Sequence, residues 1–455
     1  MAAQAQATLR AQERAPLFSA DALRRLIIPL VIEQFLAMTI GMADTIMVTS
    51  VGEHAVSGVS LVDNISTLLI NVFSALATGG AVVAAQYLGS RDEENACSAA
   101  KQLFYAIGAL SAATMAVCLL FREPILRLVF GQLEDNVMEA AMTYFLLTAI
   151  SYPLLAIYNA GAALFRAMGN SKVSMLASLL MNIVNIGLNA ILIYGADIGV
   201  AGAGFGTLFS RLAGAVLMTW LICQHGHRIH IDHLLHFEFR GQLVKKILRI
   251  GVPNGLENGM FQIGKLLVLG LVTPLGTSAT AANAIANSVA GVVNVPGNAI
   301  SLSLITVVGQ CMGAGDSKQA VRYTRKLMTI VYLAMGSLSV LLFFFATPVV
   351  GIFGLTPGAA VMAIQVLRWC AVFDLIFWPM SFSLPNALRA SGDAKFTMIV
   401  SMCSMWIFRI GFSYLLVPQI GLLGVWVAMF IDWIVRAVVF LIRFLSGRWK
   451  TKTVI

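Results

Sequence analysis

Charged residues are scarce in this chain. Asp, Glu, Lys and Arg make up 11% of its 455 residues, whereas apolar residues make up 59%. A soluble globular protein carries about 25% charged residues, which supply the polar shell of its folded form. The low charge, together with a mean hydropathy of +0.85, argues against a water-facing globule and indicates a chain that folds in a lipid bilayer.

Residue groups that mark common metal, redox and enzyme sites are also missing. No zinc, paired-histidine or serine–histidine group lies within the apolar runs, so we do not expect an enzyme. No pair of cysteines has metal or redox spacing, and the cysteines are expected to be small buried hydrophobic side chains. They lie singly in or beside apolar runs, at Cys97, Cys118, Cys223, Cys311, Cys370 and Cys403.

Long apolar runs are abundant instead. A helix that rises ~1.5 Å per residue needs about 20 residues to cross ~30 Å of hydrocarbon, and runs of this length recur along the chain. The runs are continuous rather than alternating, which favours helices over a β-barrel. The sequence therefore predicts an all-α integral membrane protein of about twelve transmembrane helices, at residues 26–50, 58–86, 100–121, 138–164, 173–195, 200–223, 247–272, 284–311, 327–350, 361–388, 396–417 and 422–445.

Basic residues are distributed unevenly between the predicted loops. With twelve spans, both chain ends lie on one side of the membrane, and the opposite loops hold little beyond Arg122 and Arg127. This asymmetry is the positive-inside pattern, so we expect a multi-pass plasma membrane protein with both termini in the cytoplasm. The net charge of +9 then reflects topology, and no nucleic acid partner is expected. The residues on the side of the termini are Arg10, Arg14, Arg24, Arg25, Arg91, Lys101, Arg166, Lys172, Arg228, Arg240, Lys245, Lys246, Lys318, Arg322, Arg325, Lys326, Arg389, Lys395, Arg443, Arg448, Lys450 and Lys452.

The second half of the chain repeats the first. An even number of helices per copy gives both copies one orientation, related by an axis along the membrane normal. We therefore expect two pseudo-symmetric six-helix lobes with a substrate cleft between them. A shift of 224 positions matches Pro29 with Pro253, Glu33 with Glu257, Gly52 with Gly276, Gln86 with Gln310, Gly89 with Gly313 and Asp92 with Asp316; after one deletion Arg166 matches Arg389, Gly169 matches Gly392 and Lys172 matches Lys395.

The repeat also sets the expected domain boundaries. They are a cytoplasmic N-terminal segment at 1–25, an N-lobe at 26–223, a cytoplasmic interlobe linker at 224–246, a C-lobe at 247–446 and a cytoplasmic tail at 447–455.

The linker holds five of the six histidines of the chain. His227, His230, His233 and His236 lie three residues apart. A period of three drifts around a helix, and no cluster of acids completes a coordination shell. We therefore expect a solvated linker and no metal site.

Asp44 is the first candidate for function. A charge at membrane depth costs at least ~2.5–3.5 kcal/mol, so each one needs a partner, a water-filled cavity or a role in transport. Asp44 lies fifteen residues after Pro29 on the first helix, which is about four turns and close to the middle of the bilayer. A poorly solvated carboxylate there is a plausible proton acceptor. A hydrogen bond that pins the helix bundle is the alternative.

Polar side chains of the fifth and sixth helices accompany Asp44. Asn185 and Asn189 lie four residues apart, with Asn182 beside them, and Thr207 lies on the next helix. Residues four apart share a helix face, and amide and hydroxyl oxygens near a carboxylate suit a hard cation or a proton relay. Polar contacts between helices are an equally good interpretation.

Acids at depth also occur in the second half. Glu257 and Asp374 can both face the bundle interior, and two close carboxylates cannot both ionise cheaply, so they would bind sodium or share a proton. Lys265, two turns from Glu257, is an alternative partner that would neutralise it. Arg409 and Asp432 form a candidate structural ion pair.

The candidates for the substrate cleft are two further acids, Glu33 and Asp63, together with Lys265 and four aromatic residues. Glu33 and Glu257 both lie four residues after a proline, which favours a geometric role, such as satisfying backbone groups freed by the proline, as strongly as transport. Asp63 lies early in the second helix, near the outer mouth. Aromatic rings attract organic cations or simply pack between helices, and the residues concerned are Phe35, Phe261, Phe377 and Trp378.

Several motifs occur in a fixed order along nearly the whole chain. They are Pro29 with Glu33, ADTIMVTSVG around Asp44, AAQYLGSRD, ALFRAMGNSK, and NIGLNAILIYG followed by GVAGAGFGT, with second-half counterparts such as NALRASGDAK. In this order they resemble the multidrug and toxic compound extrusion (MATE) transporters. The resemblance implies two six-helix lobes arranged in a V, and export of amphipathic organic cations in exchange for protons or sodium.

The resemblance also implies roles for particular residues. Asp44, Asn185 and Thr207 would belong to a cation site in the N-lobe. Asn189 stands where many members carry aspartate, which removes one ionisable group from that site. Glu257 and Asp374 resemble the sodium-linked acids in the C-lobe of other members.

These expectations combine into a secondary-active antiporter that works by alternating access. Its partners would be small organic cations and membrane lipids, its only cofactor the coupling ion H+ or Na+, and its form a monomer in a prokaryotic inner membrane. A flippase for lipid-linked precursors of the same superfamily is an alternative, and it would need a basic cleft. A channel would need a filter sequence, and a membrane-embedded enzyme is a further alternative.

Overall fold

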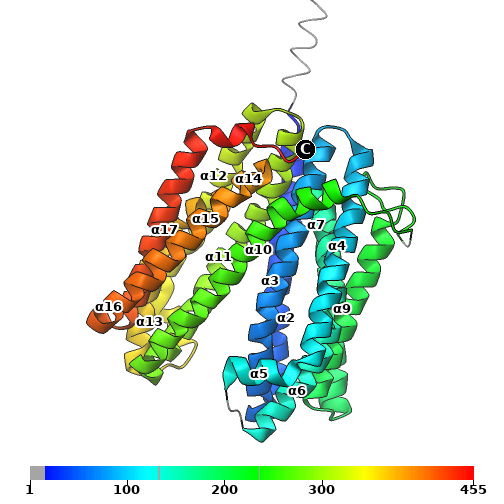
Figure 1. The fold of residues 1–455 in the computed structure, drawn as a ribbon. Helices are drawn as coiled ribbons and strands as arrows, with labels where there is room; N and C mark the ends of the chain where they lie inside the picture. The colour runs from blue at the N-terminus through cyan, green and yellow to red at the C-terminus, as the bar shows by residue number, and fades with distance from the viewer. Residues whose placement is uncertain (1–15, 132–133, 235) are drawn as a thin grey trace, which may run out of the picture.

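The computed structural model describes residues 16–131, 134–234 and 236–455, and this part of the chain is helical without strands. Of the expected N-terminal segment, residues 1–15, with Arg10 and Arg14, lie outside the described residues. The helices form two bundles (Figure 1). The N-lobe comprises α2 (Ala20–Thr49), α3 (Glu53–Gly89), α4 (Glu93–Leu120), α5 (Arg122–Phe130), α6 (Asp135–Ile150), α7 (Tyr152–Ala167), α8 (Ser171–Asn189), η1 (Ala190–Gly195) and α9 (Val200–Ile222).

The C-lobe follows after a loop. It comprises α10 (Gly241–Val272), η2 (Thr273–Leu275), α11 (Thr277–Gly313), α12 (Ser317–Gly351), α13 (Pro357–Ile376), η3 (Pro379–Ser383), α14 (Leu384–Ser391), α15 (Ala394–Ser404), η4 (Met405–Gly411), α16 (Phe412–Ile420), α17 (Leu422–Leu445) and η5 (Arg448–Thr451). Because α10 begins at Gly241, the last six residues of the expected linker, 241–246, are helical.

The predicted number of membrane spans is confirmed. Among the described residues, 11 helices are long and apolar enough to cross a membrane, and the count reaches 12 if the bent pair α6 and α7 is one span. The two helices meet at 45° around Ser151. Pro153 lies in the first turn of α7, where its missing N–H costs no helical hydrogen bond, so a new helix can begin there.

Three other predicted spans contain π-helical segments, at Ala190–Gly195, Pro379–Ser383 and Met405–Gly411. Hydropathy reports how apolar a run is and not which hydrogen-bond pattern its backbone adopts. The apolar runs at 173–195, 361–388 and 396–417 therefore predicted spans without revealing these π-helical segments.

The two lobes form the expected V. Their helices converge at the end of the molecule where the C-terminus lies, which we call the closed end, and diverge toward the opposite end (Figure 1). Each lobe has its own hydrophobic core, but the first helix of each lobe starts in the core of the other. Leu26 and Leu30 of α2 belong to the C-lobe core, and Ile247 and Ile250 of α10 belong to the N-lobe core. This reciprocal exchange couples the lobes at the closed end.

Equivalent glutamines and glycines of the repeat meet at the closed end. Gln86 Nε2 donates to the Ala390 carbonyl oxygen at 2.8 Å, and Gln310 Nε2 donates to the Ala167 carbonyl oxygen at 2.7 Å. A side chain at Gly89 would overlap the backbone of Gln310, and one at Gly313 would overlap the backbone of Gln86. Glycine at these two positions therefore permits α3 and α11 to touch through their backbones.

Candidate functional site

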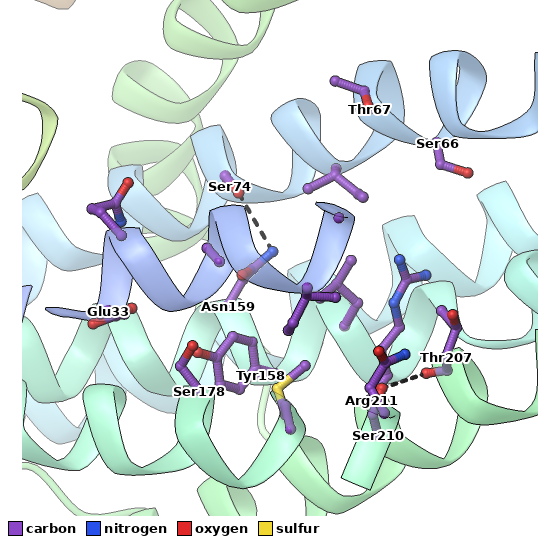
Figure 2. A pocket seen from close by; sticks show the side chains of 18 of the residues that line it. Glu33, Ser66, Thr67, Ser74, Tyr158, Asn159, Ser178, Thr207, Ser210 and Arg211 are labelled. Carbon is purple, nitrogen blue, oxygen red and sulfur yellow. Dashed lines mark hydrogen bonds between the residues drawn. The ribbon is translucent and has the colours of Figure 1, made fainter. Parts of the chain in front are cut away.

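A cavity of about 670 Å³ lies within the N-lobe. Figure 2 shows polar side chains from several helices turned toward it, among them Glu33, Arg211 and Thr207. Of the residues singled out in the sequence, Glu33, Asp44, Asp63, Asn185 and Thr207 line the cavity. The other polar lining residues are Gln34, Ser66, Thr67, Ser74, Thr78, Tyr144, Tyr158, Asn159, Arg166, Ser178, Ser210 and Arg211.

Asp44 is held from the side by the asparagines of α8. Asn189 Nδ2 donates to Asp44 Oδ1 at 2.5 Å and also approaches Asn185 Oδ1 at 3.5 Å. Gly206 of α9 lies against the Asn189 side chain and leaves the space that this amide occupies. The structure therefore brings Asp44, Asn185 and Asn189 together as the sequence indicated, and Thr207 borders the same cavity.

A second carboxylate, Asp63 on α3, shares the cavity with Asp44. Tyr144 Oη donates to Asp63 Oδ1 at 3.4 Å. Arg211 of α9 acts electrostatically on both carboxylates, while its Nη1 donates to Ser151 Oγ at 2.6 Å. Within the described ranges, neither Asp44 nor Asp63 has a cationic nitrogen within 4.0 Å.

Arg211 and Tyr144 were not predicted from the sequence. Arg211 lies in the middle of the apolar run that became α9, and a lone arginine in such a run is itself a signal. Tyr144 gave no such signal, because a tyrosine in an apolar helix looks the same whether its hydroxyl faces a cavity or a neighbouring helix.

Glu33 forms an ion pair at the other end of the cavity. Arg166 Nη1 lies 2.8 Å from Glu33 Oε1, and Ser174 Oγ donates to Glu33 Oε2 at 2.5 Å. A contact of Glu33 with backbone groups freed by Pro29 was one of the roles expected. In the structure its carboxylate is instead bound by the side chains of Arg166 and Ser174. Arg166 was assigned to the basic residues that set topology, and it is instead largely buried against an acid.

The C-lobe repeats this ion pair with one addition. Arg389, the equivalent of Arg166, lies 2.5 Å from Glu257 Oε1, and Arg436 of α17 lies 3.5 Å from the same oxygen. The alternative that Lys265 neutralises Glu257 is wrong, because the two arginines pair with Glu257 Oε1 and no ion pair joins Lys265 to Glu257 in the described residues. Glu257 Oε2 has no hydrogen-bond partner among the described residues, and a cation shared between Glu257 and Asp374 stays a prediction.

The expected ion pair between Arg409 and Asp432 is also replaced. Asp432 accepts a hydrogen bond from Ser404 Oγ at 2.6 Å and lies 4.0 Å from Arg436 Nη1, one helical turn away. Arg409 lies over the ring of Phe261, with its guanidinium carbon 5.2 Å from the centroid. The i,i+4 spacing of Asp432 and Arg436 on α17 was the signal for the correct pair.

Lys265 shares the Phe261 ring with Arg409. Its Nζ lies 5.2 Å from the ring centroid, and it borders a second cavity, of about 760 Å³, formed by α3, α4, α5 and α10. This cavity lies between the lobes, where the sequence placed the cleft, and its walls are mostly apolar. Neither Lys265 nor Arg409 has an acidic oxygen within 4.0 Å in the described part of the chain.

Asp374 is enclosed in the C-lobe. It has no exposed surface, and Cys370 Sγ donates to its Oδ2 at 3.3 Å. Its Oδ1 has no hydrogen-bond partner among the described residues. Asp374 lines neither of the two cavities described above. No described hydrogen bond or ion pair joins it to Glu257.

The four aromatic candidates do not line the N-lobe cavity. Phe35 is 41% exposed on α2, Phe377 stacks on Phe373, and Trp378 is buried and stacks on Phe382. Phe261 packs edge to face on Phe382 and faces the two cations. Three of the four are thus packing or surface residues, because helical spacing cannot distinguish a ring in a cleft from a ring between helices.

The comparison with protein families repeats the symmetry found in the sequence. The family model MatE matches the chain twice, at residues 29–191 and 253–415, with an offset of 224 positions between the matches. This is the shift that aligned the two halves of the sequence.

Individual relatives extend over most of the chain. The "Probable multidrug resistance protein NorM" of Thermotoga maritima is 27% identical over 448 residues, which cover 95% of this chain and 93% of the relative. A solved structure described as "Outward-facing conformation of a multidrug resistance MATE family transporter of the MOP superfamily" has a TM-score of 0.88 and 23% identity, covering 95% of this chain and 96% of that chain. A MOP superfamily transporter from Pyrococcus furiosus has a TM-score of 0.87 and 22% identity, covering 94% and 96%.

The two matches of the family model cover well over half of the residues, and the fold is that of solved MATE structures. The chain therefore belongs to the MatE family and is a multi-pass membrane transporter of the MATE type.

Proposed function

We propose that this protein exports amphipathic organic cations in exchange for H+ or Na+ by alternating access. The observation that carries the proposal is the N-lobe cavity, where Asp44 and Asp63 lie without a cation within ion-pair distance in the described structure. The cavity holds one more acid than it holds arginines, since Glu33, Asp44 and Asp63 face Arg166 and Arg211. A cavity with an excess negative charge attracts a positive ligand.

The same charge balance suggests how exchange works. One excess negative charge is neutralised by one monovalent cation, so an organic cation and a coupling ion compete for it. On the outside, binding of the coupling ion would then release the cargo. On the cytoplasmic side, binding of the cargo would release the coupling ion. Exchange of one monovalent cation for another moves no net charge, so the concentration gradient of the ion would drive export and the membrane potential would not.

The basic residues and the closed end support an orientation of the protein in the membrane. We propose that the closed end, with the basic loops, faces the cytoplasm of a prokaryotic cell. The V then opens to the outside, and the structure is an outward-facing state in which cargo is released. The names of the relative and of the solved structure, both of which refer to multidrug resistance, support export as the direction of transport.

The test is transport of a fluorescent organic cation, ethidium, by purified protein in liposomes. Sodium and proton gradients are imposed separately, with and without a membrane potential clamped by valinomycin. We expect flux to respond to one ion gradient and Asp44→Asn to remove that response, while Asp374→Asn, which alters an acid outside the cavity, retains it. Flux that responds to neither gradient would refute antiport, and coupling lost only in Asp374→Asn would move the site to the C-lobe.

A second candidate is transport of an anionic, lipid-linked cargo. Lys265 and Arg409 flank one ring without an acid within 4.0 Å in the described residues, and Lys265 borders the apolar cavity between the lobes. The Pyrococcus furiosus structure is described by the words "Reverse polarity of binding pocket suggests different function". A long apolar chain with a phosphate would suit a cavity of this kind.

The two candidates differ in what the C-lobe cations do. In the same liposomes, a fluorescent polyisoprenyl phosphate is offered in place of ethidium, to wild type and to Lys265→Gln. If the lipid crosses the membrane at a rate that falls in Lys265→Gln, and ethidium does not move, the second candidate replaces the first. Ethidium flux with no lipid transfer favours the first.

A further inference from the structure

The interlobe linker brings three metal-ligating side chains together. Nε2 of His225 lies 2.9 Å from Asp232 Oδ1, and Nε2 of His230 lies 3.5 Å from Asp232 Oδ2. One ligand atom from each of the three residues lies within 4.8 Å of the others. We expected no metal because histidines spaced by three drift around a helix. This part of the linker is not helical, and the residues that meet are His225, His230 and Asp232.

The backbone explains why these side chains share one face. Ile229 and Ile231 are buried in the N-lobe core, and the Ile231 N–H donates to the Ile222 carbonyl oxygen at 2.9 Å. His230 and Asp232 alternate with these two isoleucines and are 27% and 50% exposed, so both lie on the side of this segment away from the core. A turn after α9 brings His225 back to them, and His233, with φ of 47°, then turns the chain away.

His230 is held in the orientation that a metal ligand requires. Its Nδ1 lies 3.2 Å from the His227 carbonyl oxygen, and its backbone N–H donates to Cys97 Sγ of α4 at 3.5 Å. In the tautomer that donates from Nδ1 to this carbonyl oxygen, Nε2 keeps the lone pair that a metal would bind. Such a hydrogen bond on the remote ring nitrogen is the usual support of a histidine ligand.

We propose that His225, His230 and Asp232 bind one divalent transition-metal ion of the Zn2+ class. Two zinc ligands at ~2.1 Å in a tetrahedral shell stand about 3.4 Å apart. Here one ligand atom from each of the three residues lies within 4.8 Å of the others, and the two histidines face different oxygens of Asp232, at 2.9 and 3.5 Å. Two imidazoles with one carboxylate suit Zn2+, Co2+ or Ni2+, whereas Ca2+ and Mg2+ prefer oxygen ligands alone. The fourth position is left to water, because His225 and Asp232 are exposed to solvent by 79% and 50%.

A bound ion would cross-link residues of the linker to one another. The three ligands span the loop between the end of α9 and the start of α10, which is the covalent connection between the lobes. His230 and Asp232 border a hollow of about 360 Å³ against α4, and Ile229 and Ile231 of the same segment belong to the N-lobe core. This site is separate from the transport cavity and does not depend on the proposed transport function.

The test is metal binding by the full chain, purified in detergent with an affinity tag that contains no histidines. Co2+ is followed by its visible absorption and Zn2+ by calorimetry. We expect one ion per chain, and at least a tenfold weaker affinity in His225→Ala, His230→Ala and Asp232→Asn. His236→Ala is the matched control, because His236 lies in the same tract with 76% exposure and outside the cluster, and it should bind as wild type does.

Three results would overturn the proposal. The first is no binding of either ion by wild type, which would leave the contacts as ordinary histidine–aspartate ion pairs. The second is a His225→Ala/His230→Ala double variant that binds as tightly as wild type. The third is equal weakening in His236→Ala, which would indicate diffuse binding by the tract. Circular dichroism of each variant shows whether lost binding reflects lost folding.

Discussion

The two lobes share one ion pair and differ in what surrounds it. Glu33 of the N-lobe is paired with Arg166, and Glu257 of the C-lobe is paired with the equivalent Arg389. The C-lobe adds Arg436 to the same carboxylate, whereas the N-lobe adds two acids, Asp44 and Asp63, to the cavity beside its pair. The repeat has thus kept a shared structural contact while the charge around it diverged.

The additional arginine of the C-lobe pair, Arg436, results from a difference at one position of the repeat. Gly199 before α9 and Gly421 before α17 have nearly the same backbone angles, with φ of 59° and 60° and ψ of −132° and −137°. Aligning the two helices on these glycines places Arg436 at the position of Gly214, which packs against Met181. One helix thus provides a second arginine where its counterpart provides no side chain, which leaves the N-lobe pair with a single cation.

The largest expected difference concerns the loss of one arginine from each pair. Arg166→Ala leaves Glu33 buried without a cation, which costs about 3–5 kcal/mol of stability. Arg389→Ala leaves Arg436 beside Glu257, so we expect a smaller loss, of about 1–3 kcal/mol. Thermal unfolding in detergent measures both.

Two controls support this comparison. Arg127→Ala removes a solvent-exposed pair with Glu123 and should cost less than about 1 kcal/mol. Glu33→Gln combined with Arg166→Ala should recover part of the loss, because no buried charge is then left unpaired. Equal destabilisation by Arg166→Ala and Arg389→Ala would show that Arg436 does not share the charge of Glu257.

The next prediction concerns the closed end, where the lobes are most alike. Gly89→Ala and Gly313→Ala each place a methyl group on the backbone of the facing helix, and overpacking of this kind costs about 1–3 kcal/mol. The cost falls only on the state in which α3 and α11 touch, so both variants should shift the protein toward separation of the lobes at that end.

Spin labels on the two lobes at the closed end report this shift as longer distances. Gly108→Ala is the control, because a methyl group there meets nothing within 4 Å. A shift in only one of the two glycine variants would mean that the contact is not symmetric. Unchanged distances in both would mean that the helices adjust locally without opening.

The sequence predicted the membrane spans and the two lobes better than it predicted which charged side chains form ion pairs. Continuous apolar runs and the 224-residue shift were sufficient for the spans and the two lobes, because hydropathy and repetition are properties of the sequence itself, whereas the V was implied by the resemblance to MATE transporters. The group around Asp44 was also predictable, since Asn185 and Asn189 lie four apart on a helix face. Whether this group couples ions remains a prediction.

The partners of Glu257 could not be found in the same way. Lys265 lies eight residues away in sequence, yet the carboxylate pairs with Arg389 and Arg436, which are 132 and 179 residues away. An apolar helix does not reveal which neighbour each face meets, so a close charge on the same helix is a poor guide. The π-helical segments compound the difficulty, because they rotate the residues that follow them.

The smallest expected difference tests the symmetry of the glutamines at the closed end. Within the described residues, the Gln310 side chain makes one hydrogen bond, to Ala167 of the other lobe, whereas that of Gln86 makes two, because its Oε1 also accepts the N–H of Val454 in the C-terminal tail at 3.0 Å. Gln86→Ala should therefore destabilise the protein by about 1 kcal/mol more than Gln310→Ala, the net contribution of one buried hydrogen bond. Removing Val454 and Ile455 should cost less in the Gln86→Ala background than in wild type, because the bond is already lost. Thermal unfolding of the four variants in this cycle measures the coupling, and a value of zero would show that the tail binds the N-lobe only through the apolar packing of Val454.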